Sequence, residues 1–252
     1  MRIRIFSIFL LSLLLSACSD DAGQPDSGSM DADGSQAGDL AGDEGDQERA
    51  VRVLFIVDTS QSMGISDSEI LRRTEFERAV DLFLADPEVS FGAMVMGNET
   101  IMLTDGFTHS TAELGEAAAR LSQVGGNSSF RAAFGIAESR LEDDMRASKP
   151  VPNERTYYRI FLLSDSLPGL GETEAEIQED LAAIMSLQTE HGVREIRLHT
   201  ALLIDSAVHV DPAVLADMVG FFERLAETGL GSFTNYHESQ AIDFSVAIPP
   251  QS

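Results

Sequence analysis

A carboxylate and two hydroxyls stand at alternate positions directly after an apolar run in the first quarter of the chain. They are Asp58, Ser60 and Ser62, in the pattern D-x-S-x-S. No cysteine or histidine lies near them, and a donor set made only of oxygen suits a hard cation, with Mg²⁺ first and Mn²⁺ or Ca²⁺ as alternatives. Asp and Ser also cap helices and form turns, so the pattern alone leaves an ordinary turn open.

The apolar run before Asp58 predicts the strand that would position these side chains. Val51–Val57 is almost continuously apolar and mostly β-branched, which is typical of a strand buried on both faces of a parallel α/β sheet. Functional side chains in such sheets gather at the carboxyl ends of the strands. We therefore expect Asp58 at that edge, with Ser60 and Ser62 on the following loop.

Short apolar strands alternate with amphipathic helices along the rest of the chain. The turn at 97–99 is so short that it predicts an antiparallel hairpin. The pattern as a whole predicts an α/β fold with a doubly wound, mostly parallel central sheet, one antiparallel edge strand and flanking helices. Strands are expected at 51–57, 89–96, 100–104, 158–163, 197–204 and 232–237, and helices at 68–84, 110–124, 130–145, 172–189 and 211–228, with one last helical turn at 241–244.

Three local signals mark the ends of these helices. Ser110–Glu113 has the spacing of a capping box, in which a serine and a glutamate bond each other's backbone. Asp211 followed by Pro212 indicates a helix start, and Gly192 indicates a helix end.

The direction of the elements brings three distant polar clusters to one edge of the sheet. The first strand ends at Asp58, and the helix at 110–124 returns the chain to the same edge at Gly125–Ser129. The fourth strand then ends at Asp165. Because the carboxyl ends of parallel strands share an edge, these clusters should converge. That convergence favours the cation site over the ordinary turn.

The residues at these positions resemble those of the von Willebrand factor type A domain, over Ala50 to about Phe244. That family builds its metal-ion-dependent adhesion site from D-x-S-x-S, a Thr in a later Gly-rich loop and an Asp after the fourth strand. The resemblance implies Asp58, Ser60 and Ser62 as the first ligands. It implies Ser128 in the Thr place, with Ser129 as the alternative alignment, and Asp165 in L-L-S-D as the last ligand.

The sequence departs from the family pattern at several points. Ser128 keeps the hydroxyl of the usual Thr but lacks its methyl group, and Gln61 stands where many bacterial members carry Gly. The segment after Tyr236 has room for only about one helical turn. We therefore do not expect the affinity switch that relatives perform by moving a long C-terminal helix.

The resemblance implies a divalent cation whose coordination is completed by a carboxylate from a partner. Two carboxylates roughly neutralise the ion, and three hydroxyls add oxygen donors without adding charge. One position then stays open for water or for an acidic side chain of a protein ligand.

The first residues indicate a lipoprotein signal rather than part of the fold. Arg2 and Arg4 precede the apolar stretch 5–15, which is too short to span a bilayer stably. Leu15-Ser16-Ala17-Cys18 resembles the bacterial lipobox, so residues 1–17 are a predicted signal peptide and Cys18, the only cysteine, is the predicted lipidation site. Ser19 after the cysteine favours the outer membrane.

A polar and acidic segment separates Cys18 from the predicted domain. Ser19–Arg49 contains ten acidic residues and one basic residue with hardly a large apolar side chain, so it cannot bury enough surface to fold. Residues 18–49 are therefore predicted to be an acylated, solvated tether. The predicted domain spans 50–248, and residues 249–252 form a tail.

Charge excludes two classes of partner. Residues 50–252 contain 32 acidic and 14 basic side chains, which gives a net charge of −18. Such a surface opposes binding to nucleic acid and to anionic lipid head groups. Contact with the membrane is therefore expected only through the lipid anchor.

These observations together predict a membrane-anchored lipoprotein of the bacterial cell envelope, on the periplasmic or outer surface. Its type A domain would bind a protein partner or mediate adhesion with the help of a divalent cation. One alternative is a metal-independent scaffold subunit of an envelope complex. The other is a metal-dependent hydrolase, but no motif places a histidine or glutamate beside Asp58 as a general base, so we predict that the protein is not an enzyme.

Overall fold

The computed structural model describes residues 48–249, except 68–69, 148 and 239–240. The predicted signal peptide, Cys18 and nearly all of the predicted tether lie outside the described residues. In the described part, six strands form one sheet in the order β3-β2-β1-β4-β5-β6. The strands are β1 (Ala50–Asp58), β2 (Val89–Met96), β3 (Ile101–Met102), β4 (Thr156–Ser164), β5 (Glu195–Leu202) and β6 (Leu230–Asn235).

All neighbouring strands run parallel except β2 and β3, which form the antiparallel pair. This arrangement confirms the predicted doubly wound sheet with one antiparallel edge strand. Strand β1 lies between β2 and β4, with Asp58 beside Met96 and Val57 beside Leu163. The last residues of β1 and β4 therefore reach the same edge of the sheet.

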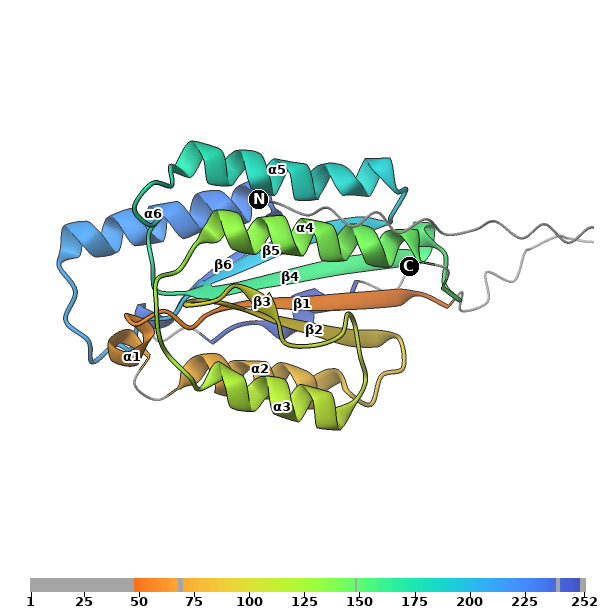
Figure 1. Cartoon of the computed structure of the whole chain (residues 1–252), viewed down its shortest axis with the longest axis horizontal. Coiled ribbons are helices and arrows are strands. Elements are labelled where there is room, and N and C mark those ends of the chain that lie inside the picture. The colour runs from red at the N-terminus through yellow and green to blue at the C-terminus, as the bar shows by residue number, and fades with distance from the viewer. Residues whose placement is uncertain (1–47, 68–69, 148, 239–240, 250–252) are drawn as a thin grey trace, which may run out of the picture. The chain divides into compact units, whose positions relative to one another are not determined.

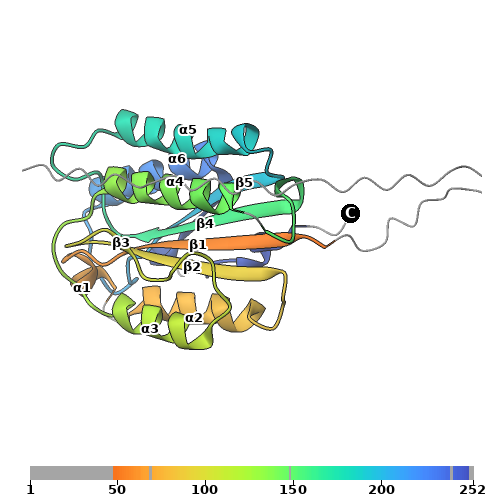
Figure 2. The same cartoon turned by 45° about the vertical axis from the view of Figure 1, so that its right-hand side comes forward.

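Helices cover both faces of the sheet (Figure 1). Helices α4, α5 and α6 lie on one face and α2 and α3 on the other, and a second view shows the same layers (Figure 2). The short helix α1 lies at the carboxyl ends of the strands. The helices are α1 (Met63–Ser66), α2 (Leu71–Phe83), α3 (Thr111–Leu121), α4 (Phe130–Arg146), α5 (Glu174–Glu190) and α6 (Pro212–Thr228).

Strand β1 is apolar along its length because it contributes to a core on each face. Leu54 and Ile56 belong to the core under α4, α5 and α6. Phe55, between them, belongs to the opposite core, where its ring lies 5.3 Å from that of Phe161 and 5.2 Å from that of Phe76. Burial on both faces explains why the sequence does not alternate between apolar and polar residues.

The helix caps match the sequence signals in most cases. Asp211 accepts from backbone N–H groups in the first turn of α6, and Gly192, just after α5, has a φ of 65°. Ser110 accepts from the Glu113 N–H at the start of α3. The reciprocal half of that predicted capping box is wrong, because the Glu113 carboxylate accepts from the N–H of Asp105 instead.

Several element boundaries differ from the predictions. The expected helix at 68–84 is α2, which starts at Leu71 after Ile70, a residue in the left-handed region with a φ of 58°. Helix α1 was not predicted. Strand β3 has only two residues, and a single-turn helix at 244–247 replaces the turn expected at 241–244.

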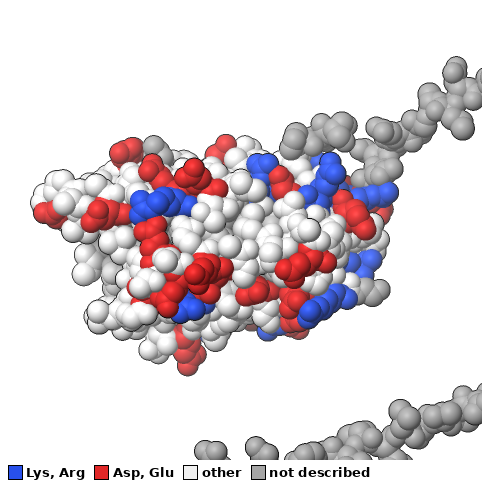
Figure 3. Space-filling model, turned by 90° about the horizontal axis from the view of Figure 1, so that it is seen from above, with Lys and Arg blue, Asp and Glu red and all other residues white. Residues whose placement is uncertain are grey.

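Several groups of acidic side chains lie among uncharged ones on the surface over α4, α5 and α6 (Figure 3). Lysine and arginine side chains form a few groups among them, and several of these groups are ion pairs. Arg131 pairs with Glu176 and Asp180, and Arg224 pairs with Glu174. The excess of negative charge counted in the sequence is therefore spread over this face of the domain.

Candidate metal centre

Asp58 ends β1 as a fully buried carboxylate with both oxygens hydrogen-bonded. The N–H of Ser60 donates to Asp58 Oδ1 over 2.7 Å, and Ser164 Oγ donates to Asp58 Oδ2 over 2.5 Å. Burial raises the pKa of Asp58 above its usual value; the bonds from Ser164 and Ser60 oppose that rise, and the charge of Asp165 adds to it. Two neighbouring strand ends thus fix this side chain.

Asp165 follows β4 and accepts hydrogen bonds only from hydroxyls among the described contacts. Ser62 Oγ donates to its Oδ1 over 2.8 Å, and Ser166 Oγ donates to the same oxygen over 3.1 Å. Ser66 Oγ donates to Asp165 Oδ2. The Asp165 side chain is buried, and its described hydrogen-bond donors are all hydroxyls. Hydroxyl dipoles rather than a basic side chain therefore compensate its charge.

A chain of hydroxyls joins the two carboxylates. Ser60 Oγ lies 3.0 Å from Ser62 Oγ, which in turn bonds to Asp165. Four of the five predicted ligands, Asp58, Ser60, Ser62 and Asp165, are therefore brought together from segments about a hundred residues apart. Ser62 is exposed, so the group opens to solvent at the edge of the sheet.

The Gly-rich loop lies against the first loop, as the strand directions predicted. The N–H of Gly125 donates to the Thr59 carbonyl over 2.8 Å, and the N–H of Gln61 donates to the Gly126 carbonyl over 3.1 Å. Gly126 has a φ of 72°, which suits glycine. Two backbone bonds therefore hold the two loops together.

Of the two alternative serines, Ser129 is occupied by helix capping. Its Oγ accepts from the Ala132 N–H and donates to Glu172 Oε1 over 2.6 Å. Ser128 is half-buried, and none of the described side-chain hydrogen bonds joins it to Asp58 or Asp165. The structure thus assigns Ser129 to the start of α4, and Ser128 stays a prediction.

The donor set fits a hard divalent cation. The described residues include no cluster of three or more His, Cys, Asp or Glu side chains suited to a metal, so a cation here would depend on two carboxylates and on hydroxyls. Two carboxylates with several hydroxyls match the preference of Mg²⁺ for oxygen and for few protein charges. Asp58, Ser60, Ser62 and Asp165 are the predicted ligands that meet here.

Sequence reasoning missed three serines of this network. Ser164 and Ser166 flank Asp165, and the first of them bonds Asp58. Ser66 stands four residues after Ser62 in α1, so the helical spacing puts both hydroxyls on the side of Asp165. The recurrence of serine at 60, 62, 66, 164 and 166 was the available signal.

The described fold and site together define a class of protein: a doubly wound α/β domain with a cluster of aspartate and serine at the carboxyl edge of the sheet. Residues 53–168 match the family model of the von Willebrand factor type A domain. This match confirms, for residues 53–168, the resemblance to the type A domain seen in the sequence.

Solved structures with this fold are distant in sequence. A von Willebrand factor type A protein from Catenulispora acidiphila has 11% identity over 79% of this chain and 40% of its own, with a TM-score of 0.51. The type V pili tip protein of Porphyromonas gingivalis has 12% identity over 74% of this chain and 47% of its own, with a TM-score of 0.51. An aerotolerance-related membrane protein from Bacteroides fragilis has 13% identity over 79% and 94%, with a TM-score of 0.50.

This chain thus spans less than half the length of the first two of these proteins. At such identities the likeness shows the fold alone. A comparison with curated proteins gives no match. No helix among the described residues is both long and apolar enough to cross a bilayer.

Proposed function

We propose that this chain is a bacterial envelope lipoprotein whose type A domain binds a protein partner through a divalent cation. One observation carries the proposal. Asp58 and Asp165 are buried carboxylates whose described partners are only hydroxyls and a backbone N–H. Buried carboxylates without a basic partner are costly unless something else supplies positive charge.

Asp58, Ser60, Ser62, Ser128 and Asp165 would hold the cation, with Mg²⁺ favoured over Mn²⁺ and Ca²⁺. When bound, the cation supplies positive charge that attracts a carboxylate from the partner. The chain's own residues provide the rest. Ser62 lies exposed where a partner can approach. Ser164 donates to Oδ2 of Asp58 and Ser66 donates to Oδ2 of Asp165, so both carboxylates are held in place.

Two further considerations support a binding role in the envelope. One structure of the same fold is a pili tip protein and another is a membrane protein. The sequence Leu15-Ser16-Ala17-Cys18 after a short apolar stretch supports lipid attachment at Cys18. Each buried CH₂ of a lipid chain contributes about 0.8 kcal/mol, so two or more chains would anchor the protein stably. We favour the outer membrane because Ser19 follows the cysteine.

We propose no enzymatic role for this site. The hydrogen bonds described around Asp58 and Asp165 come from serines and backbone groups, and none involves histidine or glutamate. Hydrolysis would need a general base or an activated water together with a substrate pocket.

Thermal unfolding of the full chain in Mg²⁺ and in EDTA tests the cation. At a concentration of about 100 times Kd, Mg²⁺ should stabilise the fold by about 2.7 kcal/mol and raise Tm. Asp58→Asn and Asp165→Asn should lose this response. Asp81→Asn, at an exposed position on α2, is the matched control and should keep it.

Capture of envelope proteins on the immobilised chain tests the partner. A specific partner should bind in Mg²⁺ and be released by EDTA, and Asp165→Asn should not retain it. A partner that stays bound in EDTA and to Asp165→Asn would replace the cation-dependent function with the metal-independent scaffold. Cys18→Ser should separately leave the membrane fraction and lose palmitate label.

A further inference from the structure

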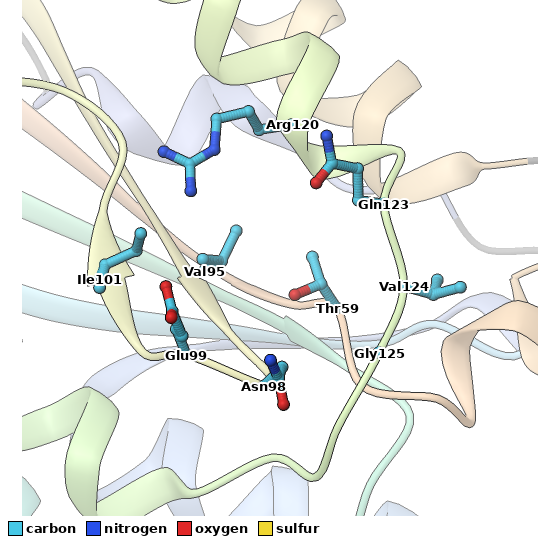
Figure 4. Close-up of a pocket in the computed structure, with 9 residues that line it drawn as sticks. All are labelled: Thr59, Val95, Asn98, Glu99, Ile101, Arg120, Gln123, Val124 and Gly125. Carbon is cyan, nitrogen blue, oxygen red and sulfur yellow. The ribbon is translucent and has the colours of Figure 1, made fainter.

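We propose that a pocket beside the metal centre binds a zwitterionic α-amino acid with a small apolar side chain, independently of any cation. The pocket has a volume of about 260 Å³. It lies between the turn that joins β2 to β3, the end of α3 and the loop that follows α3 (Figure 4). None of the five proposed cation ligands lines it.

The segments that carry several lining residues are held close together by backbone hydrogen bonds and tight glycine contacts. The N–H of Thr59 donates to the Met96 carbonyl over 2.8 Å, and the N–H of Gly125 donates to the Thr59 carbonyl over 2.8 Å. A Cβ at Gly97 would lie 2.6 Å from Thr59 Oγ1, and a Cβ at Gly126 would lie even closer to a neighbouring backbone. These contacts hold Thr59, Asn98 and Gly125, on one side of the pocket, in fixed positions.

Two opposite charges face this cavity from different elements. Arg120, in the last turn of α3, and Glu99, in the turn after β2, point toward the same space from opposite sides (Figure 4). The ion pairs and side-chain hydrogen bonds described for residues 48–249 include neither of them. Most of the other described bases are in ion pairs, as with Arg131 and Arg224.

An α-amino acid carries the two complementary charges on one carbon. Its carboxylate matches the guanidinium of Arg120, which can donate two parallel hydrogen bonds to a carboxylate. Its ammonium group matches the carboxylate of Glu99. A ligand with a single charge would pair with either Arg120 or Glu99 and leave the other side chain without a partner of opposite charge.

The rest of the lining sets the size and polarity of the ligand. Val95 and Ile101 provide an apolar surface against which a side chain can pack, and Gln123 and Thr59 add neutral polar groups. A cavity of about 260 Å³ accommodates one amino acid rather than a folded element of a partner. A small apolar side chain fits this combination best.

Isothermal titration of the full chain with individual L-amino acids tests the proposal. Alanine, valine and leucine are the probes, each titrated in EDTA. Binding should saturate with a Kd of about 1 mM or tighter. Blocking either charge of the ligand, as the N-acetyl derivative or as the amide, should weaken binding by about tenfold or more.

Two variants locate the site, and each has a matched control. Arg120→Gln and Glu99→Gln should each weaken binding by about tenfold or more. Arg140→Gln on α4 and Glu227→Gln on α6, both at exposed positions outside the pocket, should bind as the unchanged chain does. Circular dichroism verifies that all four variants are folded.

Three results would overturn the proposal: no heat of binding from any probe, equal binding by Arg120→Gln and the unchanged chain, or binding that requires Mg²⁺. Because the titration is done in EDTA, failure of the proposed cation function leaves the expected result unchanged. Loss of amino-acid binding likewise leaves the thermal response to Mg²⁺ unaffected, so the two failures are distinguishable.

Discussion

The two ends of the parallel strands treat their carboxylates differently. At the amino ends, Glu195 pairs with Arg159 and Arg197, each over 2.5 Å, and Asp144 pairs with Lys149 over 2.9 Å. At the carboxyl ends, Asp58 and Asp165 receive hydrogen bonds from serines and one backbone N–H. Both ends hold partly or fully buried acids, but Asp58 and Asp165 have no basic partner among the described contacts, whereas even Asp67, just after α1 at the same edge, is paired with buried Arg72.

Carboxylates such as Glu195 are neutralised by bases of the same chain, whereas the charges of Asp58 and Asp165 can still interact with a bound cation. An acid paired with arginine or lysine is neutralised by its own chain and has little left for a cation. Serine hydroxyls orient a carboxylate without cancelling its charge. The contrast is therefore what distinguishes a structural ion pair from a candidate cation site in this fold.

The largest expected effect comes from removing the buried base at the amino end. Arg159→Met should lower the free energy of unfolding by about 3 to 5 kcal/mol, because Arg159 is fully buried and bonds Glu195 and the Val246 carbonyl. Urea denaturation measures the loss. Arg197→Met removes a half-exposed partner of the same glutamate and should cost less than about 1 kcal/mol. Equal losses would show that burial does not decide the value of these pairs.

A second effect concerns His199, which lies in β5 and stacks on Phe161 with a centroid distance of 4.9 Å. Burial, with smaller contributions from the charges of Arg159 and Arg197, lowers the pKa of His199 to about 4. Its Nδ1 accepts from the Ser232 N–H over 3.1 Å, which requires the neutral ring. Between pH 6.5 and about 4, His199 therefore binds a proton in the unfolded state but stays neutral in the folded state.

The sign of the pH dependence follows. Above pH 6.5 both states hold neutral His199, so its full contribution is present. As the pH falls from 6.5 to about 4, the unfolded chain binds the proton and stability falls by about 3 kcal/mol. Urea midpoints across this range measure the loss, and His199→Phe should show a shallower slope. An unchanged slope would assign the acid sensitivity to carboxylates instead.

The third effect tests the hydroxyls that replace bases at the carboxyl end. Ser66→Ala removes the donor to Asp165 Oδ2 and should cost about 1 to 2 kcal/mol without metal. Ser66→Thr keeps the hydroxyl and should recover most of that loss. The measurement is again urea denaturation, now in EDTA. A Ser66→Ala variant as stable as the unchanged chain would mean that Asp165 does not depend on α1.

The smallest expected effect is the most diagnostic. Asp58→Asn should change the free energy of unfolding by less than about 1 kcal/mol in EDTA, because it removes a buried charge that lacks a base and keeps an acceptor for the Ser60 N–H. Thermal unfolding in EDTA measures it. A loss as large as that expected for Arg159→Met would place Asp58 among the structural acids and end the contrast between the two edges.

The sheet and most helices were predictable because their signals are local. The apolar run of β1 and the short turn before β3 determine strand type and direction, and Asp211-Pro212 marks the start of α6. Four site residues could be predicted because strand direction alone brings them to one edge. Helix α1 was missed because four residues directly after the D-x-S-x-S motif are too few to show helical periodicity.

The finer features of the site depend on contacts that sequence spacing does not encode. Glu113 bonds Asp105 rather than completing its capping box, since the β3–α3 connection brings that N–H closer. Ser66 and Ser164 join the network only because β1 and β4 are neighbours in the sheet. Ser129 caps α4 and also donates to Glu172 from a distant loop, a contact that its position in the sequence does not reveal.

The sequence separation across the two aspartates has a consequence for the order of folding. Ser62 and Asp165 are 103 residues apart, and Asp58 and Ser164 are 106 apart. A chain released only as far as β3 therefore has three of the five proposed ligands, and loop closure must precede binding of a cation by all of them. A cation bound there cannot nucleate folding. It would instead slow unfolding, so its effect would be read in the lifetime of the folded domain rather than in the speed at which the domain forms.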